Sequence, residues 1–154
     1  MRTYFIPLVA GVALCVSAFL PWVIIGEDSL KGFPDVAALW VAGLGALASV
    51  LAFLSLLTRK NSRHPLLVVG LVALAIVFLS WRIMPRTAGE RALTISQAFA
   101  IVENRPLNEA PNALAGSGIY LGLVSAAIIV CFGLTIVLKR VQRPYTIDSP
   151  DDDV

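Results

Sequence analysis

The chain has 154 residues, of which 58% are hydrophobic and only 14% are charged, and its formal net charge is +2. A charged fraction so far below the roughly 25% typical of soluble domains indicates lipid as the solvent. The charges are clustered, and the gaps between clusters are about 19 to 25 residues long, which is the length a helix needs to cross about 30 Å of hydrocarbon.

Four apolar segments are predicted to be membrane-spanning helices, at residues 4–25, 36–57, 66–84 and 114–138. None contains Asp, Glu, Lys or His, and Arg82 is the only charged residue within a span. Apolar runs of this length can satisfy their backbone groups in lipid only as helices. The sequence therefore predicts an all-α integral membrane protein, a four-helix transmembrane bundle that forms a single domain over residues 1–138.

The first span raises the question of a cleaved export signal, because it follows Arg2 and is interrupted by Pro21. A signal peptide has a shorter apolar core, about 7 to 15 residues, and small residues at the cleavage point. The stretch "SAFLPW" offers no such site, and Leu14 directly before Cys15 disfavours a lipoprotein signal. We therefore expect this segment to be retained, with some bending at Pro21.

Each predicted span carries an amphipathic aromatic residue at a similar outer depth: Trp22, Trp40, Trp81 and Tyr120. One interpretation is an interfacial belt, with rings among acyl chains and N–H or O–H groups at the headgroups. The alternative is a site for a lipid, a quinone or another amphipathic ligand, with Arg82 supplying a charge. Snorkelling of Arg82 to the interface explains the same residue without a ligand.

Rows of small residues predict where helices approach closely, because helices in lipid associate through close packing. The candidate helix-packing residues are Ala38, Ala42 and Ala46 in the second span and Gly118, Gly122 and Ala126 in the fourth. This spacing does not distinguish contacts within the bundle from contacts with another subunit.

The placement of Lys and Arg predicts the orientation. Seven of the twelve Lys and Arg residues fall on the side of the amino terminus, and five fall on the other. We therefore expect a multi-pass plasma-membrane protein with both termini cytoplasmic. The location that we favour is a bacterial inner membrane. Residues 139–154, which become acidic after a basic flank and contain Pro150, are expected to form a disordered cytoplasmic tail.

The long outer loop before the fourth span contains Ile95, Phe99 and Val102 at the spacing of one helical face. This spacing predicts a short amphipathic helix, with Thr94 as N-cap and Pro106 limiting its end. The helix could form a lid over the bundle or lie on the membrane. It could instead be a docking surface for another membrane or extracytoplasmic protein, since long loops are often functional.

The sequence identifies no catalytic, cofactor-binding or metal-binding residues. Cys15 and Cys131 are unpaired within different spans, and His64 is the only histidine. A proton-coupled exporter would need a carboxylate inside a span, and none is present. We therefore expect no enzymatic activity, no cofactor and no nucleic-acid partner.

The predicted arrangement of four spans and outer loops, with an aromatic residue near the end of the first span, is similar to that of claudin-like and tetraspanin-like proteins. The chain has no extracellular cysteine pair and no Trp-Gly-Leu-Trp run. The resemblance is thus limited to topology, and no family is assigned.

The function expected from the sequence is that of a non-enzymatic accessory or structural subunit of a larger membrane complex. Its partners would be membrane lipids and other membrane protein subunits or further copies of itself. The alternative is a small lipid- or quinone-binding or transport protein that uses the outer aromatic site.

Overall fold

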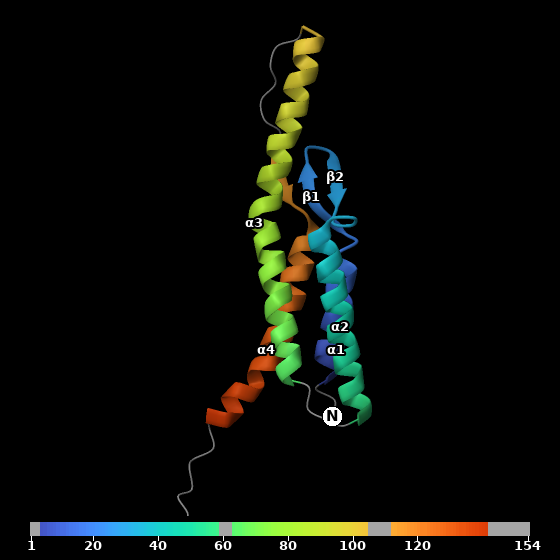
Figure 1. The fold of residues 1–154 in the computed structure, drawn as a ribbon, viewed down its shortest axis with the longest axis vertical. Helices are drawn as coiled ribbons and strands as arrows, with labels where there is room; N and C mark the ends of the chain where they lie inside the picture. The colour runs from blue at the N-terminus through green and yellow to red at the C-terminus, as the bar shows by residue number, and fades with distance from the viewer. Residues whose placement is uncertain (1–3, 59–62, 105–111, 142–154) are drawn as a thin grey trace, which may run out of the picture.

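Helices make up most of the computed structural model, which describes residues 4–58, 63–104 and 112–141, the last six as backbone only. The helices are α1 (Phe5–Ser17), α2 (Val36–Thr58), α3 (Arg63–Val102) and α4 (Ser117–Val141). They lie side by side, α1 against α2 and α4, and α3 against α4 and α2. The start of α1 and the end of α4 lie at the same end of the molecule (Figure 1).

Three of the described helices, α2, α3 and α4, are long and apolar enough to cross a membrane. α1 is apolar but has only 13 residues, so it is about 20 Å long. It falls short of the hydrocarbon thickness by itself.

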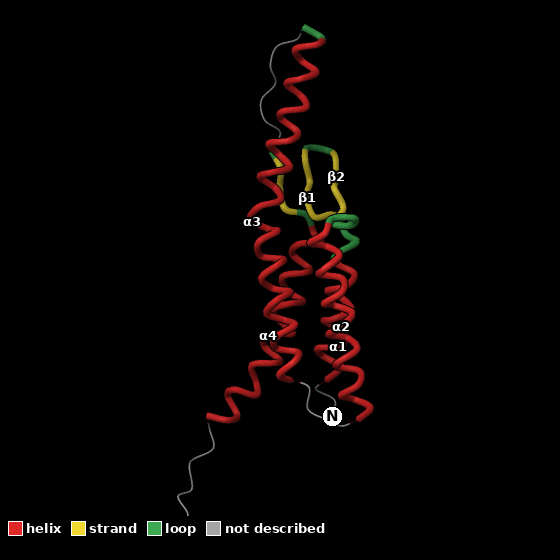
Figure 2. Tube along the Cα trace, viewed as in Figure 1, coloured by secondary structure: helices red, strands yellow, loops and turns green. Residues whose placement is uncertain are grey.

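A small antiparallel sheet covers one end of the helices (Figure 2). Its strands are β1 (Pro21–Ile25), β2 (Asp28–Lys31) and β3 (Ala113–Ala115), in the order β2-β1-β3. The register shifts between Pro21 and Val23. This irregularity allows the successive residues Trp22 and Val23 both to be buried, whereas side chains alternate between faces in a regular strand.

The helix predicted over residues 4–25 is wrong beyond Ser17, where α1 ends. The carbonyl of Ser17 would accept its helical bond from residue 21, but Pro21 has no N–H. The indole N–H of Trp22 donates to that carbonyl instead, at 2.8 Å. The β-branched residues that follow then pair with two strands.

The short separate helix predicted in the outer loop is also wrong, because α3 runs without interruption from Arg63 to Val102. Pro85 lies inside it and removes one helical hydrogen bond. Beyond the proline, Arg86 and Glu90 form an ion pair at 3.1 Å one turn apart. The fall in hydropathy after residue 84 therefore does not mark the end of the helix.

The other two spans lie close to their predicted positions. α2 begins at the predicted residue and ends one residue later, at Thr58. The predicted fourth span starts too early, because Leu114 belongs to β3, and α4 continues to Val141. The first three residues of the predicted tail are thus helical, and the rest, 142–154, lie outside the described residues.

Glycines allow the helices to pack backbone against backbone. A Cβ on Gly45 of α2 would lie 2.6 Å from the backbone nitrogen of Cys15 on α1. Likewise, a Cβ on Gly133 of α4 would lie 2.6 Å from the Cβ of Leu67 on α3. These two close crossings are of the kind by which helices associate in lipid.

Candidate functional site

Trp22 is enclosed by three segments of the chain. Only 1% of its surface is exposed, and its indole N–H donates a hydrogen bond to the carbonyl of Ser17, the last residue of α1. A Cβ on Gly32 or Gly118 would lie 2.7 Å from an atom of its indole ring. Trp22 therefore joins the end of α1, the hairpin and the start of α4, and the structure places it in the core and not among lipids.

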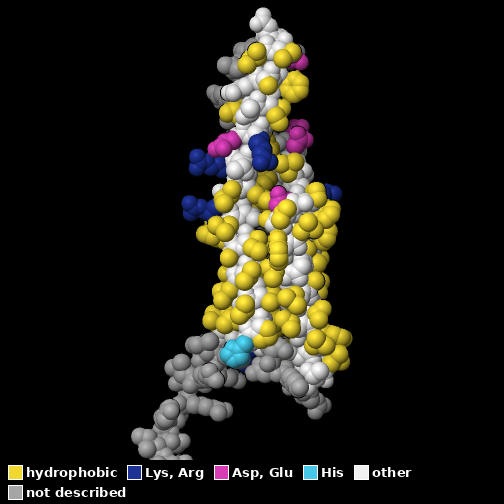
Figure 3. Space-filling model, in the orientation of Figure 1, with side chains coloured by type: hydrophobic (Ala, Val, Ile, Leu, Met, Phe, Trp, Pro, Cys, Tyr) yellow, Lys and Arg dark blue, Asp and Glu magenta, His cyan; other side chains and the backbone are white. Residues whose placement is uncertain are grey.

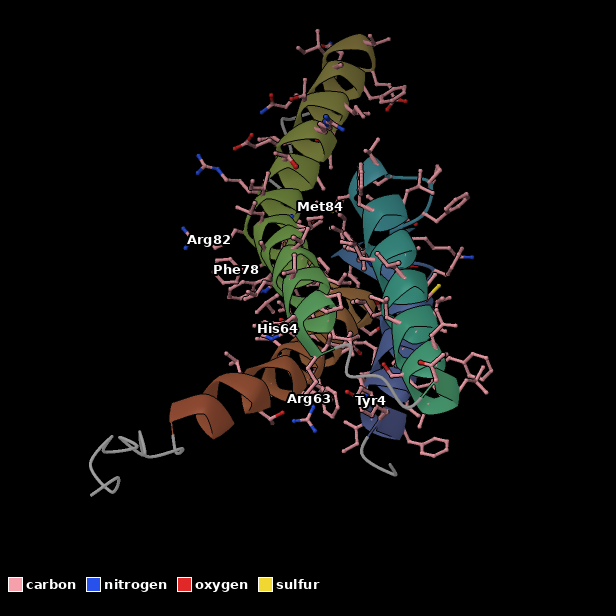
Figure 4. The ribbon with its side chains drawn as sticks, turned by 60° about the horizontal axis from the view of Figure 1, so that its bottom comes forward. Tyr4, Arg63, His64, Phe78, Arg82 and Met84 are labelled. Carbon is pink, nitrogen blue, oxygen red and sulfur yellow. The ribbon has the colours of Figure 1, made fainter. Side chains whose placement is uncertain are left out.

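The other residues of the predicted aromatic site lie on the outside of the helices. Trp40 is 62% exposed, Tyr120 53% and Trp81 37%. Arg82 and Met84 lie on opposite sides of α3, with Arg82 pointing away from the other helices (Figure 4). Trp22, Trp40 and Arg82 line three separate cavities. The structure thus does not bring the five predicted residues together.

The two predicted rows of small residues differ in burial. Gly118, Gly122 and Ala126 are all buried, on the face of α4 that meets α1 and α3. In the α2 row, Ala38 is buried, Ala42 is half-buried and Ala46 is exposed. The buried row of α2 instead continues through other residues: Val41, Gly45, Ala48, Ala52 and Ser55.

A cavity of about 370 Å³ lies between the hairpin and α3. Trp22 and Met84 form part of its apolar lining, and Lys31, Asp35 and Arg91 contribute charged groups. An apolar side chain of a partner could enter such a cavity while its polar neighbours meet the charges.

We call residues 91–102 of α3 the outer arm, because they carry the helix beyond the sheet (Figure 1). The exposed fractions of the predicted docking residues are 58% for Ile95, 62% for Phe99 and 84% for Val102. Ile101, which the periodicity did not single out, is 73% exposed. The outer arm therefore presents several large apolar side chains on its surface.

The face shown in Figure 3 has hydrophobic side chains gathered in a band along the helices, with most of the charged side chains beyond the band on the side of the sheet. On α3 the band is bounded by His64 and Arg82, which are 18 residues apart. At 1.5 Å per residue this separation is about 27 Å, close to the thickness of the hydrocarbon core of a bilayer.

A polar and aromatic cluster lies at the opposite end of the band, and sequence reasoning did not single it out. The guanidinium of Arg63 donates to the Thr135 hydroxyl at 3.2 Å and lies 5.4 Å from the centre of the Phe132 ring. Tyr4 meets the same ring edge to face, at 5.1 Å. The sequence feature that points to this cluster is the position of Arg63 at the start of an apolar helix.

Within the described ranges, no three His, Cys, Asp or Glu side chains gather as they would around a metal ion. Comparison of the chain with protein-family models, with curated proteins and with solved structures found no match.

Proposed function

We propose that this chain is a non-enzymatic integral membrane protein, an accessory or structural subunit that binds a neighbouring membrane protein through its outer arm. The sheet and the outer arm would lie together on one aqueous side. The ends of α1 and α4 farthest from the sheet would lie on the cytoplasmic side.

Exposed apolar surface on the helices supports the membrane placement. Only 28% of the apolar window of α2 and 33% of that of α3 is buried inside the protein. Large residues such as Phe53, Leu57 and Leu79 are more than half exposed. Apolar surface this extensive is unfavourable in water and is expected where lipid tails surround a bundle.

The observation that carries the proposed function is the exposed apolar face of the outer arm. From Arg82, at the edge of the band, to Val102 the helix rises about 30 Å at 1.5 Å per residue. Phe99 and Val102 would then stand in water, where contiguous apolar side chains mark an interaction site. The lipid would be too far from Phe99 and Val102 to cover them, so a partner protein would be needed to remove this surface from water.

A lid, the alternative suggested by the sequence, has less support. A lid would fold back across the end of the bundle, but α3 continues past the sheet in its own direction (Figure 2). The cavity beside the hairpin, which includes Arg91, lies at the base of the outer arm. Cavity and arm therefore offer one continuous surface to a partner.

The outer aromatic ligand site also has less support, because Trp22 is structural and Trp40 and Tyr120 are exposed on separate helices. The belt interpretation suits the exposed aromatics better, since amphipathic rings favour the headgroup level.

The proposed function can be tested by photo-crosslinking in intact membranes. A photoreactive amino acid replaces Phe99 in one variant and Leu79, which is 56% exposed but lies inside the apolar band, in a control variant. We expect position 99 to give one discrete protein adduct whose mass distinguishes a different subunit from a second copy. Identical adducts from positions 79 and 99, or no protein adduct from position 99, would contradict the proposal.

A further inference from the structure

A lateral groove of about 650 Å³ runs along α4 at the end of the molecule away from the sheet. Its wall on α4 is a stripe on one helix face, in which Val124 is followed by the adjacent residues Ala127 and Ile128 and then by Cys131 and Thr135. Ile6 of α1, Phe132 of α4 and Arg63 of α3 complete the lining. The wall is therefore apolar along its length, with a cation at one end.

The groove has the length of one bilayer leaflet. Val124 and Thr135 are 11 residues apart, which corresponds to about 16 Å along a helix at 1.5 Å per residue. One leaflet contributes half of the hydrocarbon core, or about 15 Å. Since Thr135 bonds Arg63 at the edge of the band, the groove reaches from the cytoplasmic interface to the middle of the membrane.

The cation at its end is held in place by the protein. The Thr135 hydroxyl accepts a hydrogen bond from Arg63, and the Phe132 ring lies beside the guanidinium. Figure 4 shows Arg63 and Tyr4 at this same end of the helices. A guanidinium has five N–H donors in a fixed fork, which suits phosphate oxygens, and a positioned one loses little entropy on binding.

We propose that this groove binds one acyl chain of an anionic phospholipid, with the headgroup phosphate at Arg63. The inference rests on the membrane placement proposed above but not on the outer arm. Charge complementarity favours an anionic lipid, because Arg63 is the charged residue of the described groove lining and no acidic residue belongs to that lining. Basic pockets between helices on the cytoplasmic side are a known means of recognising anionic headgroups.

The test uses the purified full chain in neutral detergent with equal amounts of phosphatidylglycerol and phosphatidylcholine that carry the same acyl chains. Native mass spectrometry measures the ratio of the two lipids that the protein retains. We expect the wild type to retain one phosphatidylglycerol in preference, because choline cancels the phosphate charge in phosphatidylcholine. Arg63→Gln should lower the ratio about fivefold, as for loss of one arginine beside an anionic headgroup. Arg82→Gln, which removes an exposed arginine at the opposite end of the band, is the matched control and should leave the ratio unchanged.

A second variant, Cys131→Trp, separates the groove from the charge. Cys131 is exposed within the groove wall, so a bulky side chain there should reduce retention of both lipids while the circular dichroism spectrum stays helical. This variant also keeps the proposal testable if Arg63→Gln fails to fold. The proposal is overturned by equal retention of both lipids in the wild type, by an unchanged ratio in folded Arg63→Gln, or by undiminished retention in Cys131→Trp. None of these results affects the crosslink expected at position 99, so the two proposals can fail separately.

Discussion

Replacing Trp22 with Phe tests the joint between α1, the hairpin and α4. The change removes the indole N–H, so the carbonyl of Ser17 loses the shorter of its two hydrogen bonds, 2.8 Å against 3.3 Å from the Leu20 N–H. Because the carbonyl keeps the Leu20 bond, the loss is that of one ordinary hydrogen bond, about 0.5–1.5 kcal/mol. The smaller ring also leaves a cavity at a site that is 1% exposed, a cost bounded from above by the roughly 3–5 kcal/mol of a truncation to Ala.

We therefore expect Trp22→Phe to lower the free energy of unfolding by about 2–4 kcal/mol. For a chain of this size each kcal/mol corresponds to about 2–4 °C in Tm. The assay is thermal unfolding of the purified protein in mild detergent, followed by far-ultraviolet circular dichroism. Trp40→Phe is the matched control, because Trp40 is 62% exposed, and its effect should stay within about 0.5 kcal/mol. Equal losses of Tm in the two variants would refute the structural role of Trp22.

Two further predictions concern substitutions whose surroundings the structure defines. Gly118→Ala places a Cβ 2.7 Å from both the Ser17 carbonyl oxygen and the Trp22 ring, so it should lower stability by about 1–3 kcal/mol. In Gly43→Ala nothing lies within 4 Å of the new Cβ, so the free energy of unfolding should stay unchanged or rise by up to about 1 kcal/mol. A larger loss of stability at Gly43 than at Gly118 would contradict the packing described for these two glycines. Arg86→Gln breaks an ion pair whose side chains are 83% and 64% exposed, so the free energy of unfolding should change by less than about 0.5 kcal/mol. A larger loss of stability would show that the part of α3 after Pro85 depends on this ion pair.

The long apolar helices could be predicted from the sequence because hydropathy directly reports which residues tolerate lipid. The start of α2 at Val36 illustrates this, since an apolar run follows the charged turn immediately. Hydropathy does not report where a helix ends in water, however. α3 leaves the apolar band near Arg82 and remains helical to Val102, so the predicted boundary at Met84 marks the end of the apolar composition and not the end of the helix.

The sheet could not be predicted, because it depends on contacts far apart in the chain. Val23 pairs with Ala115, and a strand of three residues has no pattern that distinguishes it from the start of an apolar helix. Near Pro21, where α1 has ended, the indole N–H of Trp22 supplies the hydrogen bond to the Ser17 carbonyl that the proline cannot.

At the candidate sites, the spacing of residues predicts which side chains share a helix face, but it does not predict whether that face points toward the core or outward. The spacing of Ile95, Phe99 and Val102 identified an apolar face that is indeed exposed. The shared depth of the aromatics did not reveal that Trp22 faces the core while Trp40 faces outward. The Arg63 cluster was not found, because its partner Thr135 lies on another helix.

The size of the native particle tests the central claim most directly, namely that this membrane protein binds a partner protein through its outer arm. The full chain and the variant Phe99→Gln are purified from membranes in mild detergent, and native mass spectrometry determines the mass of each assembly. We predict that the wild-type assembly contains a stoichiometric second protein or second copy, and that Phe99→Gln is monomeric with an unchanged Tm. A monomeric wild-type particle, or a variant assembly of the same mass as the wild type, would contradict the claim.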